Sequence, residues 1–94
     1  MAEKMPVEQV REAAAQLEGW TAEGNDRLSR SFKFKDHIEA MGFVTRVAMA
    51  AEVMDHHPDL RIVYNNVEIH LSSHDAGGVT ERDIRLAKRI NELV

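Results

Sequence analysis

The chain has 94 residues, of which 44% are apolar and 30% are charged, and its mean hydropathy is −0.39. This length predicts a single domain over residues 1–94, and the composition is typical of a globular protein rather than a disordered tail. The net charge of −4 argues against direct binding to nucleic acid, because counterion release from phosphates requires basic side chains. The sequence also has no cysteine, no apolar run of about 20 residues and no signal-peptide core, so we expect a cytoplasmic protein without disulfides or membrane contacts.

The N-terminal part of the chain predicts one helix. Apolar residues recur at helical spacing from Val7 to Leu17, and Gly19 stands where a helix often ends. We therefore expect a helix over residues 6–18.

A β-hairpin is predicted next. Residues 27–34 alternate between apolar and polar, with Leu28, Phe32 and Phe34 on one face, which indicates a strand. The turn-forming sequence Gly24-Asn25-Asp26 connects this strand to a shorter one before it. The basic residues of the region are assigned to the solvent-exposed face: Arg27, Arg30, Lys33 and Lys35.

A long central helix is predicted from Asp36 onward. Asp36 has an acidic residue three positions later, which is the capping-box spacing, and an apolar stripe continues to Met54. Pro58 disfavours the α conformation at His57, so we expect the helix to end there. This places His56 and His57 at a helix C-terminus.

A second hairpin is predicted around Asn65-Asn66, since asparagine readily takes the left-handed conformation of a tight turn. A two-residue loop at these positions fixes the register of the two strands. The pairs expected on one sheet face are Tyr64 with Val67, Ile62 with Ile69, and Leu60 with Leu71. The residues expected on the other face are Arg61, Glu68, His70 and Ser72, with His70 opposite Arg61.

The last helix is expected to begin at Thr80, which has the capping spacing with Asp83, and to run to the end of the chain. The order of elements is then α-β-β-α-β-β-α. This order predicts an α+β fold, in which three helices pack on one face of a four-stranded antiparallel sheet.

Three histidines near the ends of two elements are the main candidates for chemistry. His56 and His57 close the central helix, and His74 follows the last strand. Imidazole titrates near neutrality, so histidines that converge in space are suited to general acid-base catalysis. Glu52 lies four residues before His56 on the same helix face, and we expect its carboxylate to keep His56 protonated and ready to act as an acid.

Other interpretations of the histidines remain open. His56 could serve only as a helix cap, and His74 only as a hydrogen-bonded loop residue. A zinc site is a rival interpretation, with Glu52 or Asp55 as a further ligand, although the helical His-Glu-x-x-His pattern is absent. A Ser-His-Asp hydrolase is a weaker one, because no Gly-x-Ser-x-Gly elbow accompanies the run Ser72-Ser73-His74.

Three further residues are explained by structural roles from their positions alone. His70 is expected in the sheet or at a subunit contact and receives no catalytic role. Trp20 is expected in the core, and Asp83 is sufficiently explained as a helix cap.

Several spaced motifs follow one another in a fixed order along the chain. They are Phe32-Lys33-Phe34, Gly42-Phe43-x-Thr45-Arg46-Val47-Ala48, Glu52-x-x-x-His56-His57-Pro58, Tyr64-Asn65, Leu71-Ser72-Ser73-His74-Asp75 and Glu81-Arg82-Asp83. Together they resemble the pterin-4a-carbinolamine dehydratase family, from about Trp20 to the last helix. The sequence departs from the family pattern at Ser73, Asp75 and Asp59-Leu60, and none of these departures removes a histidine.

The resemblance implies an enzyme that dehydrates 4a-hydroxytetrahydropterin to quinonoid dihydropterin, in tetrahydropterin recycling after aromatic amino acid hydroxylation. It implies acid-base roles for His56 and His74, and binding and orientation of the substrate by His57. The elimination needs an acid for the departing oxygen and a base for a ring-nitrogen proton, so we expect no metal and no other cofactor. The implied substrate contacts are Asp55, His56, His57, Ser72, Ser73, His74, Asp75 and, beside the pocket, Trp20, with Glu52, Pro58 and Asp83 in support.

The resemblance also implies an alternative function and an oligomer. Family members in animals serve as dimerisation cofactors of a transcription factor, so the alternative is a non-enzymatic protein-binding module whose partner the sequence does not identify. A sheet with helices on one face leaves its other face and its edges to be covered, which favours a dimer or tetramer. The resemblance points to a tetramer, and Phe32 and Phe34 are the candidate contact.

Overall fold

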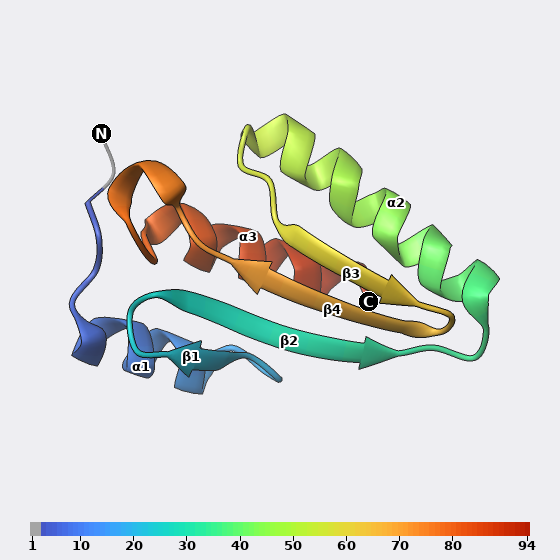
Figure 1. Ribbon diagram of the computed structural model, residues 1–94, viewed down its shortest axis with the longest axis horizontal. Coiled ribbons are helices and arrows are strands. Elements are labelled where there is room, and N and C mark those ends of the chain that lie inside the picture. The colour runs from blue at the N-terminus through green and yellow to red at the C-terminus, as the bar shows by residue number, and fades with distance from the viewer. Residues whose placement is uncertain (1–2) are drawn as a thin grey trace.

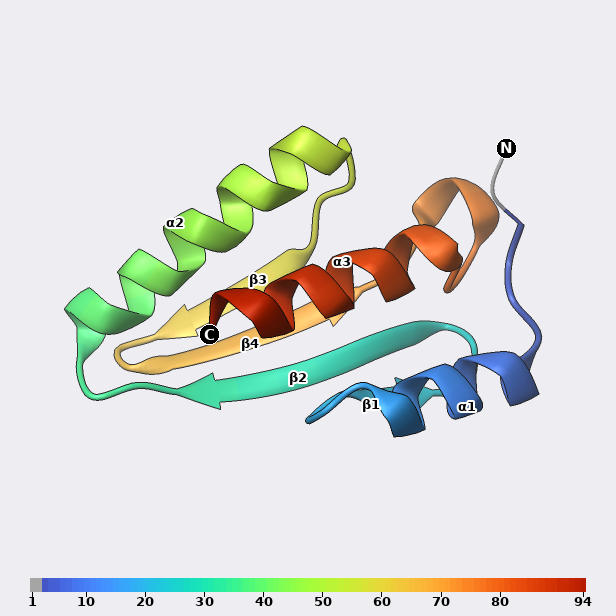
Figure 2. The same ribbon diagram turned by 180° about the vertical axis from the view of Figure 1, so that it is seen from behind.

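The computed structural model describes residues 3–94, and its elements follow the predicted order. The helices are α1 (Val7–Gln16), α2 (His37–Met54) and α3 (Glu81–Leu93), with a short 3-10 turn, η1 (His74–Ala76), before α3. The strands are β1 (Thr21–Glu23), β2 (Arg27–Lys33), β3 (Asp59–Val63) and β4 (Asn66–Leu71). They form one antiparallel sheet in the order β1-β2-β4-β3, and the helices cover one of its faces (Figure 1, Figure 2). The predicted α+β fold is confirmed, and none of the described helices is long and apolar enough to cross a membrane.

The core lies between the sheet and the helices. Phe43 of α2 packs against Phe32 and Phe34, with ring centroids 4.8 and 5.0 Å apart respectively. Phe32 is buried and Phe34 is partly buried against the same core. Both rings therefore pack inside the chain, and the predicted role of Phe32 and Phe34 as a subunit contact stays a prediction that the burial of Phe32 does not favour. Other fully buried side chains are Leu28, Val47, Ile69, Leu71, Leu86 and Ile90.

The second hairpin turns one residue earlier than predicted, at Tyr64-Asn65. Its pairs are Val63 with Asn66, Ile62 with Val67, Arg61 with Glu68, Leu60 with Ile69, and Asp59 with His70. The predicted register is wrong by two positions, which still keeps Leu60 and Ile62 on the sheet face assigned to them. Tyr64 leaves the sheet: it is exposed and takes a left-handed φ of 54°.

Contacts from distant parts of the chain account for this turn. Asn65 is tied to the end of β2 by two hydrogen bonds, from Phe34 N to Asn65 O at 2.9 Å and from Asn65 Nδ2 to Phe34 O at 2.8 Å. His37 Nδ1, at the start of α2, donates to the carbonyl of Tyr64 at 2.7 Å. These bonds join residues about 30 positions apart, so the position of the turn could not be predicted from the turn preferences of neighbouring residues.

Arg30 faces the helices, and its predicted place on the solvent face is wrong. Its Nη1 donates to Glu18 O at 2.9 Å and to Asn91 Oδ1 at 2.6 Å, while the guanidinium lies 4.4 Å from the centroid of the Phe32 ring. Gly19 makes room for this side chain, because a Cβ built there would lie 2.4 Å from Arg30 Nε, and its φ of 82° also favours glycine. α1 itself ends earlier, at Gln16.

Candidate functional site

The end of α2 separates the two adjacent histidines. The helix ends at Met54 rather than at His57, because Asp55 takes a left-handed φ of 50°. The backbone N–H of His56 then donates to the carbonyl of Ala51 at 3.1 Å, which satisfies one of the last acceptors of the helix. As a result His56 is turned inward and is only 8% exposed, whereas His57 remains at the surface.

His56 binds a fully buried carboxylate in the first turn of α3. Its Nε2 lies 2.5 Å from Asp83 Oδ1, and Asp83 Oδ2 accepts hydrogen bonds from Ser73 Oγ at 2.8 Å and from Thr80 N at 2.9 Å. An ionised carboxylate can only accept, so Nε2 of His56 carries a proton and donates it to Asp83. This bond fixes the tautomer and the orientation of the ring, and it leaves Nδ1 as the nitrogen free for proton exchange.

Asp83 therefore does more than the sequence indicated. Its predicted capping role is confirmed, since Thr80 and Asp83 form a reciprocal capping box at the start of α3. The same carboxylate also holds an imidazole 27 positions away. The capping spacing gave no sign of this second bond, because it depends on how α2 and α3 pack.

Glu52 contacts His57, and the predicted pairing with His56 is wrong. Glu52 Oε1 lies 2.8 Å from His57 Nε2, and both side chains are largely exposed. The prediction assumed helical spacing between Glu52 and His56, but the helix has already ended before His56. Glu52 thus orients the surface histidine and not the buried one.

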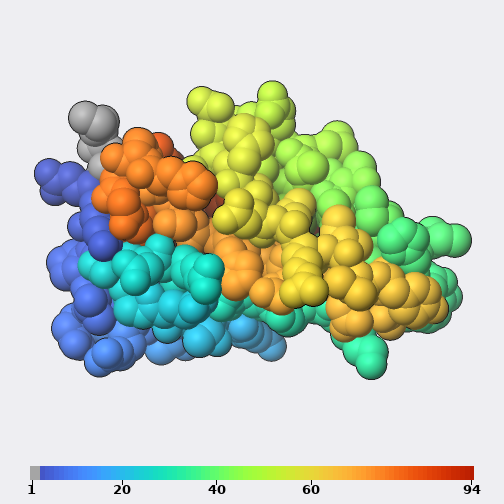
Figure 3. Space-filling view, in the orientation of Figure 1, coloured from blue at the N-terminus to red at the C-terminus, as the bar shows by residue number. Residues whose placement is uncertain are grey.

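His74 lies in η1 and is exposed. In Figure 3 the loop that contains η1 (orange) and the end of α2 (yellow-green) meet at one surface. Ser73, just before His74, is buried and bonded to Asp83. Asp75, just after it, accepts a hydrogen bond from Arg82 Nη2 at 2.5 Å, which lowers the pKa of the Asp75 carboxyl, and the charge of His56 lowers it further by a smaller amount.

The structure thus joins two of the predicted site residues, His56 and Ser73, through Asp83, and it places others elsewhere. Ser72 points toward the β1–β2 turn and donates from Oγ to Asp26 O at 2.8 Å. Trp20 is buried, as expected for a core residue, and its indole N–H donates to Asn91 Oδ1 at 2.8 Å. Asn91 lies in the last turn of α3, at the opposite end from Asp83, so a place for Trp20 beside the histidines is not supported.

His70 and Arg61 lie elsewhere, on the sheet face that the helices leave uncovered. His70 lies opposite Asp59 and Ser29 rather than opposite Arg61, so the predicted pair is wrong. Its Nε2 is 2.6 Å from Glu68 Oε1. The expectation of a role in the sheet fits this position.

Two rival chemistries can be compared with this geometry. In residues 3–94 no group of three histidine, aspartate or glutamate side chains is arranged to hold a metal ion. Ser73 donates its hydroxyl proton to Asp83 and not to a histidine. The carboxylate stands between serine and imidazole, which is the wrong order for a Ser-His-Asp nucleophile.

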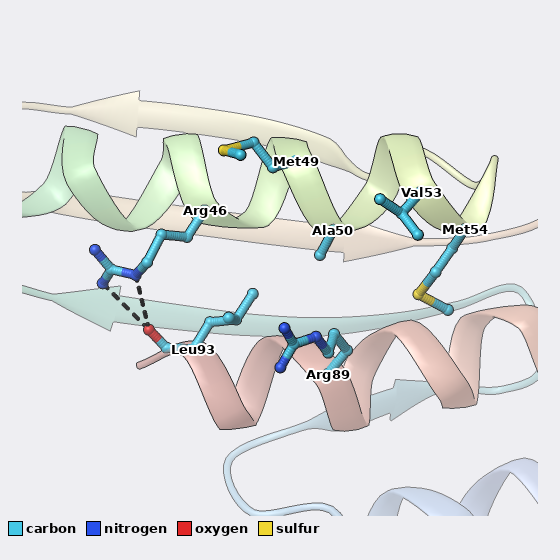
Figure 4. A pocket seen from close by; sticks show the side chains of 7 residues that line it. All are labelled: Arg46, Met49, Ala50, Val53, Met54, Arg89 and Leu93. Carbon is cyan, nitrogen blue, oxygen red and sulfur yellow. Dashed lines mark hydrogen bonds between the residues drawn. The ribbon is translucent and has the colours of Figure 1, made fainter.

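A cleft of about 360 Å³ lies away from the histidines, between α2 and α3 (Figure 4). Its lining residues are Arg46, Met49, Ala50, Val53, Met54, Arg89 and Leu93. Arg46 donates from Nε and Nη2 to the carbonyl of Leu93, at 3.3 and 3.2 Å, and so joins the two helices. None of the side chains that line this cleft titrates near neutrality.

Known proteins are similar to this chain both in sequence and in fold. The family model for pterin 4 alpha carbinolamine dehydratase matches residues 3–93. A relative from Paraburkholderia xenovorans is 52% identical over 94 residues, 99% of this chain and 98% of its own, and one from Afipia carboxidovorans is 52% identical over 84 residues, 88% and 84% of the two chains. Both carry the provisional name of a pterin-4-alpha-carbinolamine dehydratase.

The solved structures include a relative from Brucella melitensis, described as a transcriptional coactivator/pterin dehydratase. It superimposes with a TM-score of 0.91 at 39% identity, over 97% of this chain and 98% of its own. With the family model, the curated relatives and the fold in agreement, this chain belongs to the pterin-4a-carbinolamine dehydratase family.

Proposed function

We propose that this protein dehydrates 4a-hydroxytetrahydropterin to quinonoid dihydropterin by histidine acid-base catalysis, and that it acts in tetrahydropterin recycling. The buried pair of His56 and Asp83, with His57 and His74 exposed beside it, is the observation that carries the proposal. Membership of the dehydratase family supports the reaction class. The arrangement supports the division of roles among the residues.

The reaction requires two proton transfers and no change of oxidation state. A protonated His56 gives the proton on Nδ1 to the 4a-hydroxyl while the C–O bond breaks, and water leaves. The adjacent ring nitrogen supplies the electron pair for a new C=N bond and loses its own proton to His74. Asp83 keeps its hydrogen bond to Nε2 throughout, so the ring of His56 stays in place as its charge changes.

The substrate is a flat polar heterocycle, and the groups around the histidines suit its recognition. Glu52 holds the imidazole of His57 at the surface, where it can orient the pterin. Asp55 and Asp75, which precede His56 and follow His74 in the chain, add two exposed carboxylates. These contacts are part of the proposal, and no cofactor is included in it.

The direct test is to generate 4a-hydroxytetrahydropterin chemically and to follow its dehydration spectroscopically with and without the protein. We expect the purified protein to accelerate the reaction, and the His56→Ala/His74→Ala double variant to have little effect. A rate equal to the spontaneous one with the folded wild-type protein would exclude the proposed activity.

The same proposal includes a homo-oligomer formed through α2. A helix that is apolar on all sides is normally buried, yet α2 leaves Ile38, Met49 and Val53 exposed. Met41 and Met49 lie four positions on either side of Thr45, and Ile38 and Val53 lie seven and eight positions from it. An antiparallel second copy centred on Thr45 therefore places methionine against methionine and isoleucine against valine.

Oligomeric state can be measured by light scattering at micromolar concentration. We expect the wild-type protein to be a dimer or tetramer and the Met49→Glu/Val53→Glu variant to dissociate, while Lys88→Glu on the exposed face of α3 keeps the wild-type mass. A monomeric wild-type protein contradicts this part of the proposal. That result would assign the exposed face of α2 to contact with another protein. This is the alternative function, a protein-binding module, and the description of the Brucella melitensis relative as a coactivator favours it.

A further inference from the structure

The first turn of α3 contacts both residues that flank His74. From inside the fold, Asp83 Oδ2 accepts the hydroxyl proton of Ser73 at 2.8 Å. From the surface, Arg82 Nη2 donates to Asp75 Oδ1 at 2.5 Å. His74 stands between these two anchored neighbours, and the residues that anchor them are themselves adjacent in the chain.

The turn that contains His74 is closed at its ends by two backbone hydrogen bonds, from Ser73 N to Gly78 O at 2.9 Å and from Gly78 N to Ser73 O at 3.2 Å. η1 is a single 3-10 turn, held within itself by backbone bonds from Ala76 N to Ser73 O at 3.0 Å and from Gly77 N to His74 O at 3.2 Å. It has no side-chain cap, and it ends at Gly77 with a left-handed φ of 76°. Because His74 is exposed, the position of its imidazole follows the position of this short turn.

Arg82 holds Asp75 in a defined orientation. While Nη2 binds the carboxylate, Nε donates to Thr80 Oγ1 at 3.4 Å, and the guanidinium is partly buried. Two donors on one planar group fix its direction, which the single ammonium of a lysine does not do. The lowered pKa of Asp75 keeps its carboxylate charged, and the pair intact, throughout the neutral range.

We propose that Arg82 is a positioning residue for His74, which acts through Asp75. The proposal rests on the dehydratase function proposed above. An exposed ion pair contributes little to folding stability, so removing it should displace the η1 turn without unfolding the chain. Displacements on the order of 1 Å in a catalytic group can lower a rate by up to about 100-fold.

The test compares Arg82→Gln, Arg82→Lys, Asp75→Asn and the Arg82→Gln/Asp75→Asn double variant with the wild type. Arg85→Gln is the matched control, because it removes the same charge from an exposed position on the same helix. We expect Arg82→Gln to lower kcat about 10-fold, with KM changed less than about threefold and Tm within about 4 °C of the wild type. Arg82→Lys should recover part of the loss, and the double variant should be no slower than Arg82→Gln, since both changes break one pair.

A second measurement does not depend on activity. The Cε1–Hε1 NMR resonance of the His74 ring should move in Arg82→Gln and in Asp75→Asn, and should stay in place in Arg85→Gln. An unmoved His74 resonance, a wild-type kcat in Arg82→Gln, or multiplicative losses in the double variant would each overturn the proposal. If the wild-type protein has no dehydratase activity, the proposed function fails, and the NMR comparison still decides whether Arg82 positions His74.

Discussion

Replacing Asp83 by asparagine tests the central contact of the site, because the side chain keeps its shape and loses its charge. Asp83 accepts three hydrogen bonds, from His56 Nε2, Ser73 Oγ and Thr80 N. Asparagine has one oxygen to accept with and an amide group that donates. If that oxygen keeps the bonds to Ser73 and Thr80, the amide faces His56 and favours a ring whose Nε2 accepts, which is the other tautomer.

The expected loss of turnover is large and the expected loss of stability is moderate. A catalytic imidazole held in the wrong tautomer should lower kcat by about 10² to 10⁴. Weaker hydrogen bonds at this buried site should lower the free energy of unfolding by about 1–3 kcal/mol, because the charge that strengthened them is lost. The unfolding entropy of a 94-residue chain is about 0.2 kcal/mol per kelvin, so this corresponds to a fall in Tm of about 5–15 °C.

The assay measures kcat at saturating 4a-hydroxytetrahydropterin, at a temperature below the start of unfolding, and Tm by circular dichroism. Asp36→Ala is the control for stability, because it removes the N-cap side chain of α2, at a cost of about 1 kcal/mol, and lies at the opposite end of α2 from His56. We expect it to retain most of the activity. Turnover by folded Asp83→Asn within about threefold of the wild type would refute the role assigned to this carboxylate.

The remaining predictions concern the histidines, metal ions and pH. His74→Ala should lower kcat by about 10² to 10⁴ without unfolding, and normal turnover in that variant would contradict its role as a base. His57→Ala should mainly raise KM, and a loss of kcat at unchanged KM would argue against substrate orientation. Activity should survive exhaustive chelation of metal ions. Loss of activity when zinc is removed, with recovery when zinc is added back, would restore the metal interpretation. Because the folded-state pKa of Asp75 is lowered, its ion pair is complete above about pH 4 and is lost only as the pH falls below that. Any decline of kcat/KM between pH 7 and pH 5 should therefore come from groups other than Asp75, and it should persist in Asp75→Asn.

Periodicity and capping patterns in the sequence were enough to predict the fold. The alternation in residues 27–34 and the capping spacings at Asp36 and Thr80 depend on neighbours within four positions, and the structure has a strand and two capped helices there. The failures involve contacts between distant segments. The turn at Tyr64-Asn65 is set by bonds to residues about 30 positions away, which no local turn preference contains.

The same distinction applies to the site. The three histidines could be selected because their side-chain chemistry is informative wherever they lie. Their partners could not be assigned, because the partner of His56 depends on the helix ending at Met54 and on the packing of α3 against it. Arg82 lay inside a recognised motif but received no role, since its bond to Asp75 spans seven positions across a loop.

Asp83 and Arg82 are adjacent in one helical turn, but their substitution should have different consequences. Asp83 is fully buried, so its bonds contribute to folding and to catalysis at once, and a variant cannot lose one without some loss of the other. Arg82 is partly exposed and its partner lies at the surface, so its bond contributes little to folding, and its loss should affect the position of η1 almost alone. Substitutions at Arg82 therefore offer the cleaner measure of how much the placement of His74 contributes to turnover. Substitutions at Asp83 can be interpreted only when kcat and Tm are measured on the same preparation.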